Sequence, residues 1–226
     1  LSGGSASTLA IEFSAGTQRI VVNCGGAAFA GGAMPVRLAQ GLRANAAHSS
    51  LGLDDTNSTA VLINGKLGAG VSEVEVDRRQ VAGDNGRRGA TRIEAAHDGY
   101  APRFGLTHRR TLQLRDDGGE LLGEDVLTPS GRRGKRGKVG FAIRFHLAPG
   151  VEPWLSEDGR GVALALPDGS HWQFRSGTGD KAVKLALDDS LWADGPGRAH
   201  ATRQIVITGM VSRGGGSFPW LFKRMA

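Results

Sequence analysis

Apolar and polar residues alternate with a period of two along most of this chain. Residues 139–147, for example, place Phe141, Ile143 and Phe145 on one face and Arg144 on the other. This alternation is typical of β-strands that are buried on one side. Strands and strand pairs are expected at 8–16, 18–25, 60–65, 71–79, 109–127, 139–147, 159–177, 181–192, 202–212 and 217–224.

Turn signals divide these segments at intervals that are typical of all-β folds. The sequences DDGG and PDG lie inside 109–127 and 159–177, so each of these two segments predicts a β-hairpin. Only 35–48 could form a helical turn, and no repeat or Pro/Ser-rich linker divides the chain. We therefore predict an all-β fold in which residues 1–226 form a single large antiparallel β-sandwich of about a dozen strands or more.

Composition narrows the class of protein. The 36 glycines follow no fixed period, which indicates many tight turns. No run of about 18 apolar residues is present, so we expect no membrane-spanning segment. Cys24 is the only cysteine and cannot form an internal disulfide, which leaves the compartment open, periplasmic or cytoplasmic. The LSGGSAST start indicates a chain cut from a longer protein.

The formal net charge of +6 suggests an acidic partner, either a nucleic acid or an anionic polysaccharide. The excess is concentrated in GRRGKRGK, residues 131–138, which we interpret as a solvated hairpin loop, with polyanion binding as the alternative. This run contains no aromatic residue for stacking on bases and no helix pattern that would enter a groove. Nucleic acid is therefore disfavoured as a partner.

The common catalytic and zinc motifs are missing. GGAAFAGG, residues 25–32, lacks the lysine of a phosphate-binding loop, and there is no G-x-S-x-G, C-x-x-C or H-E-x-x-H. His108 and His146 are expected to point at solvent or at a neighbouring strand. His48 enters a strand beside polar turn residues and is a candidate ligand or base. The dense segment from His97 to Arg110 suits either carboxylate and sulfate binding or an ordinary solvated sheet.

Five segments together resemble a known family. These are RIVVNCG, RANAAHSSLGLDDTNS, HDGYAPRFGLTHRRTLQLRDDGGELLGEDVL, FAIRFHLAPGV and TRQIVITG. In this order and spacing they resemble the C-terminal β-sandwich domain of bacterial heparinase II/III-like proteins, over nearly the whole chain.

The resemblance implies a function for a longer protein. Family members are typically polysaccharide lyases in which an N-terminal α/α-toroid domain precedes the sandwich. They cleave uronic-acid-containing polysaccharides by β-elimination, with a base that removes the C5 proton and a group that neutralises the uronate carboxylate. The toroid is absent from this chain and would be its partner in the longer protein. An acidic polysaccharide is the expected substrate.

The family's metal positions are degenerate in this sequence. Its His-x-His-Ala-Asp pattern falls on residues 3–7, which contain no histidine or aspartate, and its Val-Asp-Pro-Gly falls on 22–25, with Asn23 at the aspartate position. Its Ala-His-Asn-Thr falls on 47–50 and keeps His48. Asn23 and His48 are thus the remaining candidate metal ligands. An amide is a poor substitute for a carboxylate, so we expect no cofactor and doubt that zinc or calcium binds.

Two functions remain open for the domain. In the first, it is the C-terminal part of a lyase and is inactive when isolated, with Tyr100, Arg103 and Arg43 as candidate substrate-binding residues and the catalytic residues unknown. In the second, it is a non-catalytic carbohydrate-binding or structural module from a branch that has lost its metal site.

Overall fold

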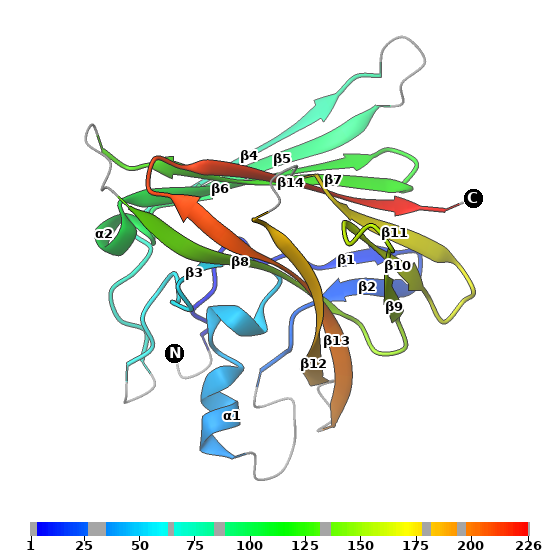
Figure 1. The fold of residues 1–226 in the computed structure, drawn as a ribbon, viewed down its shortest axis with the longest axis horizontal. Coiled ribbons are helices and arrows are strands. Elements are labelled where there is room, and N and C mark those ends of the chain that lie inside the picture. Colours follow the sequence, from blue (N-terminus) through cyan, green and yellow to red (C-terminus); the bar gives the residue numbers. More distant parts are fainter. Residues whose placement is uncertain are drawn as a thin grey trace.

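The computed structural model describes residues 4–26, 35–62, 66–83, 89–131, 137–177, 182–193 and 198–225. Fourteen strands in these residues form two antiparallel sheets that lie face to face (Figure 1). The predicted all-β sandwich is therefore confirmed. The described helices include none that is long and apolar enough to cross a membrane.

The smaller sheet has six strands in the order β1-β2-β8-β13-β12, and β3 also pairs with β8. Its strands are β1 (Phe13–Ala15), β2 (Gln18–Val22), β3 (Leu51–Leu53), β8 (Lys138–Leu147), β12 (Lys184–Ala193) and β13 (Ala199–Ser212). The long β8 is the centre of this sheet, because β2, β3 and β13 all pair with it.

The larger sheet has eight strands in the order β4-β5-β6-β7-β14-β11-β10-β9. Its strands are β4 (Val74–Val81), β5 (Ala90–His97), β6 (Leu106–Arg115), β7 (Glu120–Pro129), β9 (Glu152–Leu155), β10 (Gly161–Ala165), β11 (His171–Ser176) and β14 (Gly216–Arg224). The predicted hairpins at 109–127 and 159–177 are β6–β7 and β10–β11. The last strand, β14, inserts between these two hairpins and joins them into one sheet.

The core lies between the two sheets and is rich in aromatic rings. Phe145 of β8 faces the larger sheet, with its ring centroid 4.7 Å from that of Trp220 and 5.3 Å from that of Phe174. Gly123 of β7 lies opposite Trp220, and a Cβ at this glycine would come within 2.1 Å of the indole ring. The glycine therefore makes room for the indole ring of Trp220.

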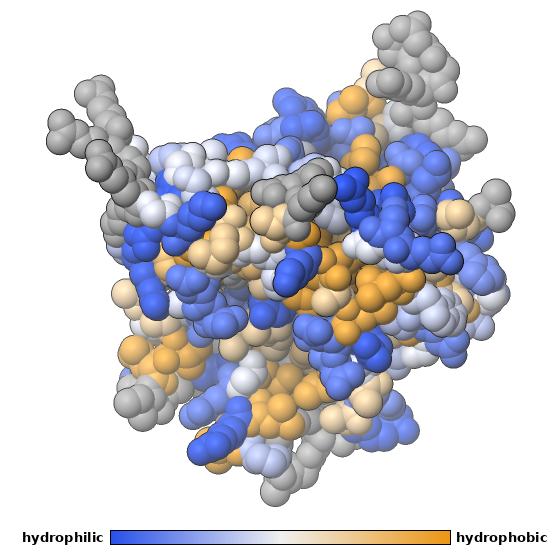
Figure 2. All heavy atoms as spheres, viewed as in Figure 1, coloured by the Kyte–Doolittle hydropathy of each residue, from blue (hydrophilic) through white to orange (hydrophobic). Residues whose placement is uncertain are grey.

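The outer face of the molecule is largely polar. Figure 2 shows hydrophilic side chains over much of one side, with apolar areas between them. At the edge strand β4, Val74 and Val76 are 54% and 68% exposed, although their alternation predicted a buried face. Among the described strands, β4 pairs with β5 alone and forms the edge of the larger sheet, where both valines remain exposed.

Two short segments differ from the expected strands, and a third is helical as expected. The strand expected at 8–16 is reduced to β1, because the backbone before it bonds to loop carbonyls, with Ile11 N donating to Ser49 O. In the strand expected at 60–65, Val61 forms a single bridge with Leu67, and 63–65 lie outside the described residues. The expected helical turn at 35–48 is α1 (Val36–Gly41) followed by a 3₁₀ turn at Asn45–Ala47.

One helix was not predicted. Residues Ala101–Phe104 form a single turn, α2, with Pro102 in its first turn and Gly105 at its end. Gly105 has a φ of 72°, a left-handed conformation that glycine adopts without strain. This turn connects β5 to β6 and lies at one end of the larger sheet (Figure 1).

Candidate functional site

A buried carboxylate lies at the centre of the polar residues on β6 and β7. The guanidinium of Arg110 donates to Asp125 from both Nε, at 2.8 Å, and Nη2, at 3.0 Å. His108 Nε2 lies 2.7 Å from Asp125 Oδ1, and Trp220 Nε1 donates to Oδ2 at 2.9 Å. All four side chains are buried. Burial alone would raise the pKa of Asp125, but Arg110 and His108 outweigh burial and hold it well below its usual range.

Arg110 also connects the two layers of the sandwich. Its Nη1 donates to the carbonyl oxygens of Leu9, at 2.9 Å, and Ser49, at 2.8 Å. Both acceptors lie in the loops that flank the smaller sheet, 101 and 61 residues away in sequence. A buried guanidinium with this many acceptors is satisfied, which is the condition for a charge to remain inside a protein.

Two histidines extend this network towards the surface. The amide of Gly99 donates to His97 Nδ1 at 3.1 Å, which assigns the ring proton of His97 to Nε2. This Nε2 lies 3.2 Å from His108 Nδ1, so His97 donates to His108 and His108 donates to Asp125. Both imidazoles are then neutral. Burial lowers the pKa of His97 to about 3 and also lowers that of His108.

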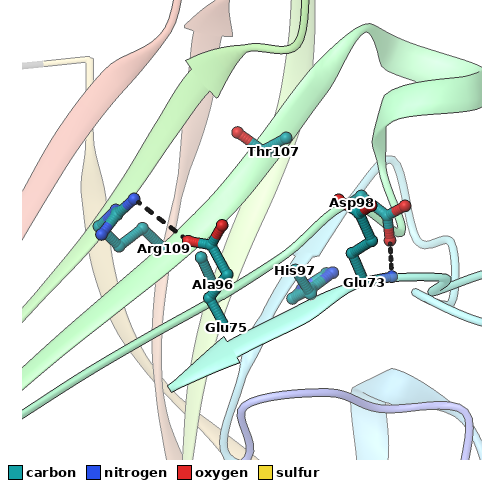
Figure 3. Close-up of a pocket in the computed structure, with 7 residues that line it drawn as sticks. All are labelled: Glu73, Glu75, Ala96, His97, Asp98, Thr107 and Arg109. Carbon is teal, nitrogen blue, oxygen red and sulfur yellow. Dashed lines mark hydrogen bonds and ion pairs between the residues drawn. The ribbon is translucent and has the colours of Figure 1, made fainter. Parts of the chain in front are cut away.

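The chain of histidines ends beneath a small pocket, of about 170 Å³, on β4, β5 and β6 (Figure 3). Asp98 at its rim accepts hydrogen bonds from the hydroxyl and the amide of Ser72, which lower its pKa to about 2. Arg109 lies 3.9 Å from Glu75 across the opening. The volume is below the usual range for small-molecule sites, and His97 is only 3% exposed. The geometry therefore favours a packing role for His97.

Hydrogen bonds to the surrounding loops hold both candidate metal ligands, Asn23 and His48, in place. Asn23 accepts a hydrogen bond from the Ser49 amide at 2.9 Å and donates to Glu12 at 3.2 Å. His48 Nδ1 donates to the Ala44 carbonyl at 2.8 Å, and burial lowers the pKa of the ring. Within the described residues, no group of three or more His, Cys, Asp or Glu side chains is arranged to hold a metal ion.

A third buried histidine, His146, lies next to this loop. His146 is 2% exposed, and its Nε2 donates to the Ala46 carbonyl at 3.0 Å. Its Nδ1 accepts from the Ser190 hydroxyl at 2.7 Å and lies 3.4 Å from Cys24 Sγ. Burial lowers the pKa of His146 to about 4 and raises that of the Cys24 thiol. Sequence reasoning missed this cluster, because its side chains come from β8, β12 and the loop after β2.

The expectation that His108 and His146 point at solvent or at a neighbouring strand is confirmed for His108 and is wrong for His146. His108 reaches Asp125 on the neighbouring strand β7, whereas His146 reaches Ser190 on β12, which β13 separates from β8, and neither side chain points at solvent. The loop around the 3₁₀ turn covers the outer side of the smaller sheet. The side chain of His146 points from β8 towards this loop, so it is buried although it lies on the face opposite Phe145. The alternation in 139–147 gave no signal of this, because it places His146 on the same face as Arg144.

The candidate substrate-binding residues occupy different environments. Tyr100 is 1% exposed, and its hydroxyl donates to the Leu51 carbonyl at 2.7 Å, so this hydroxyl serves the packing of β3. Burial raises the pKa of the phenol. Arg103 is exposed on α2, while Arg43 Nε donates to the Gly4 carbonyl at 2.9 Å. Contact of these residues with a substrate stays a prediction.

Known structures share this fold. A heparan sulfate lyase, HepC, from Pedobacter heparinus superposes with a TM-score of 0.71 at 15% identity, over 97% of this chain and 30% of that chain. A heparinase III structure gives a TM-score of 0.72 at 11% identity, over 98% of this chain and 30% of that chain. These likenesses establish the architecture.

Sequence comparison gives a relative and a family. FtsZ-localized protein C of Caulobacter vibrioides is 30% identical over 208 residues, which are 89% of this chain and 34% of that protein. The chain thus spans about a third of the length of the proteins it resembles. The family model described as heparinase II/III-like, C-terminal, matches residues 1–221. The chain belongs to the heparinase II/III-like C-terminal family.

Proposed function

We propose that this chain is the C-terminal sandwich of a longer bacterial protein of the polysaccharide lyase class. That protein would cleave a uronic-acid-containing polysaccharide by β-elimination, with an N-terminal toroid as the partner domain. The match to the heparinase II/III-like family supports this proposal, as does the fold shared with heparan sulfate lyase structures. Within the longer protein, the sandwich would support the catalytic domain and would be inactive by itself.

The burial of the candidate acid–base groups carries the proposal that the sandwich is inactive alone. β-Elimination needs a base within hydrogen-bonding reach of the C5 proton and a positive group beside the uronate carboxylate. His97, His108 and His146 are at most 3% exposed and are hydrogen-bonded inside the protein. His48 is half-buried, and its Nδ1 is bonded to the Ala44 carbonyl. The Tyr100 hydroxyl is likewise bonded to Leu51. The catalytic groups would therefore come from the rest of the longer protein.

A second candidate function is a non-catalytic module that binds carbohydrate or stabilises a partner domain. The amide of Asn23 at a family aspartate position favours it, because this amide is bonded to Ser49 and Glu12. The relative that is named for its localisation with FtsZ also favours it, since that name describes a location in the cell and no reaction.

The test is a lyase assay on the longer protein and on this chain. Each is incubated with alginate, heparin, heparan sulfate, chondroitin and hyaluronan, and the ultraviolet absorbance of unsaturated product is followed. We expect product from the longer protein with at least one polysaccharide and none from this chain. Product from this chain, abolished by His48→Ala, would overturn its non-catalytic role. A longer protein that is inactive on all five would favour the second candidate function.

A further inference from the structure

Most edges of the two sheets are protected against pairing with another strand. Strands β1 and β3 have three residues each, and β9 has four, one of which is Pro153. Strand β12 is longer, but β9 lies close beside it. Short length, proline and cover by another element are common ways in which proteins block an edge strand.

Strand β4 differs from these edges. It has eight residues, which pair with β5 in unbroken register and include no proline. Seven of the eight are exposed, and β4 runs along the border of the larger sheet (Figure 1). Among the described strands, β5 alone pairs with it, so one side of its backbone can accept a further strand.

The charges on one face of the β4–β5 hairpin are divided into an acidic and a basic row. Asp77 of β4 lies opposite Glu94 of β5, and Arg79 lies opposite Arg92. The two rows are adjacent, because Arg79 Nη2 is 3.1 Å and Arg92 Nη2 is 2.6 Å from Glu94 Oε1. A second copy of this hairpin in antiparallel orientation would present its rows in the reverse order, so acidic residues would lie opposite basic ones.

We propose that β4 pairs in antiparallel orientation with β4 of a second copy of this chain, which joins the two larger sheets into one. With the two-fold axis at Arg78, Asp77 lies opposite the partner's Arg79, and this contact occurs twice by symmetry. Each acidic row then continues into a basic row of the second copy. Val76, which is 68% exposed, lies opposite the partner's Gln80, so pairing also covers apolar surface. The dimer goes beyond the proposed lyase function and needs no catalytic group.

Charge selects this register among those nearby. Residues directly opposite each other lie on the same face of a sheet, so the axis must pass at a residue. An axis at Asp77 would bring two aspartates together, and an axis at Val76 would place Glu75 opposite the partner's Asp77. An axis at Arg78 brings two arginines together, but this residue is exposed and its long side chain keeps the guanidinium in water.

Analytical ultracentrifugation measures the mass of the chain as its concentration is raised. We expect a change from monomer towards dimer between about 1 and 100 μM, since one strand pair buries less area than a standard interface. Asp77→Arg and Arg79→Asp should each weaken the dimer roughly tenfold, because each places like charges opposite each other at both symmetry-related contacts. Glu157→Arg, on an exposed turn, is the matched control and should leave dimerisation unchanged.

A mixture of the two variants separates pairing from folding. Asp77→Arg and Arg79→Asp in equal amounts should dimerise again, because the reversed charges match across the axis. General loss of stability would not be reversed by mixing. The proposal is overturned if the wild-type chain stays monomeric over this range, or if the mixture is no more dimeric than either variant alone.

Cross-linking tests the register independently. Arg78→Cys places a thiol at the axis, where opposite Cα atoms lie about 4.5–5.5 Å apart, so a short bismaleimide should give a covalent dimer. Val74→Cys is the matched control on the same face, because its two copies would lie about 26 Å apart, eight residues along the strands. The native Cys24 is buried. Equal yields of covalent dimer from the two variants, or none from Arg78→Cys, would show that β4 does not pair in this way.

Discussion

His108 and Asp125 meet across strands β6 and β7, with Nε2 of the imidazole 2.7 Å from Oδ1 of the carboxylate and neither side chain exposed. Arg110 lies directly opposite Asp125 in the strand register, and His108 is two residues away on the same face. The carboxylate thus receives hydrogen bonds from Arg110, His108 and Trp220. It connects three strands through one side chain, and its loss would leave buried donors unsatisfied.

We expect Asp125→Asn to lower the free energy of unfolding by about 3–5 kcal/mol, because the Arg110 guanidinium would remain buried without its counter-charge. Urea unfolding followed by circular dichroism measures this change. Asp158→Asn is the control, since it removes an ion pair with Arg175 that is partly exposed, 2.8 Å between Nη2 and Oδ2. If Asp125→Asn and Asp158→Asn lowered the free energy of unfolding by similar amounts, the stabilising role of the buried network would be contradicted.

Stability is expected to fall as the pH is lowered from about 6.5 towards 4. Burial lowers the pKa of His97 to about 3 and that of His146 to about 4, so the unfolded chain takes up protons at these sites before the folded one does. Each such histidine stabilises the fold fully above pH 6.5 and loses about 1.4 kcal/mol per pH unit below it. Asp125, whose folded pKa is depressed, adds a further loss below about pH 4.

The measurement is the free energy of unfolding in urea at several pH values between 7.5 and 4. His146→Gln should reduce the slope against pH, whereas His171→Gln, at an exposed position on β11, is the control for loss of a surface imidazole. If the free energy of unfolding changed equally with pH in the wild type and in His146→Gln, His146 would not contribute to the pH dependence of stability.

We expect no tightly bound divalent metal at one equivalent. Asn23 is committed to Ser49 and Glu12, and His48 would be left without the further ligands that a closed site of four requires. Elemental analysis of protein purified without chelator measures the metal content. One equivalent of zinc that is lost in His48→Ala would show that the family's metal site has survived.

The basic run at 131–138 is expected to behave as a solvated loop. Residues 132–136 lie outside the described residues. In the sequence, glycines at 134 and 137 separate the charges, and we expect that fixing these basic side chains on a ligand would cost entropy. The test replaces Arg132, Arg133, Lys135, Arg136 and Lys138 with serine. Retention on heparin resin should then fall no more than on a plain cation exchanger. A larger fall on heparin, with steep salt dependence, would identify a polyanion-binding loop.

The local elements could be predicted because their signals are local. The period-two pattern and the DDGG and PDG turns gave β6–β7 and β10–β11, since each hairpin pairs neighbours in sequence. Pairing of β14 with both β7 and β11 joins segments far apart in sequence. No local pattern encodes such a pairing, so the sequence predicted the strands but not their order.

In the candidate site, likewise, the sequence determines the types of residue, whereas the tertiary structure determines their surroundings. The sequence alone determined that the chain is all-β, because this follows from its periodicity, whereas the degenerate metal positions Asn23 and His48 stay a prediction from the family resemblance. Only the tertiary structure decided that His97, His108 and His146 are buried, since their partners Asp125, Ser190 and Ala46 arrive from other strands and loops. A polar side chain can be buried without a large cost only when hydrogen-bond partners surround it, and these partners come together only in the folded chain.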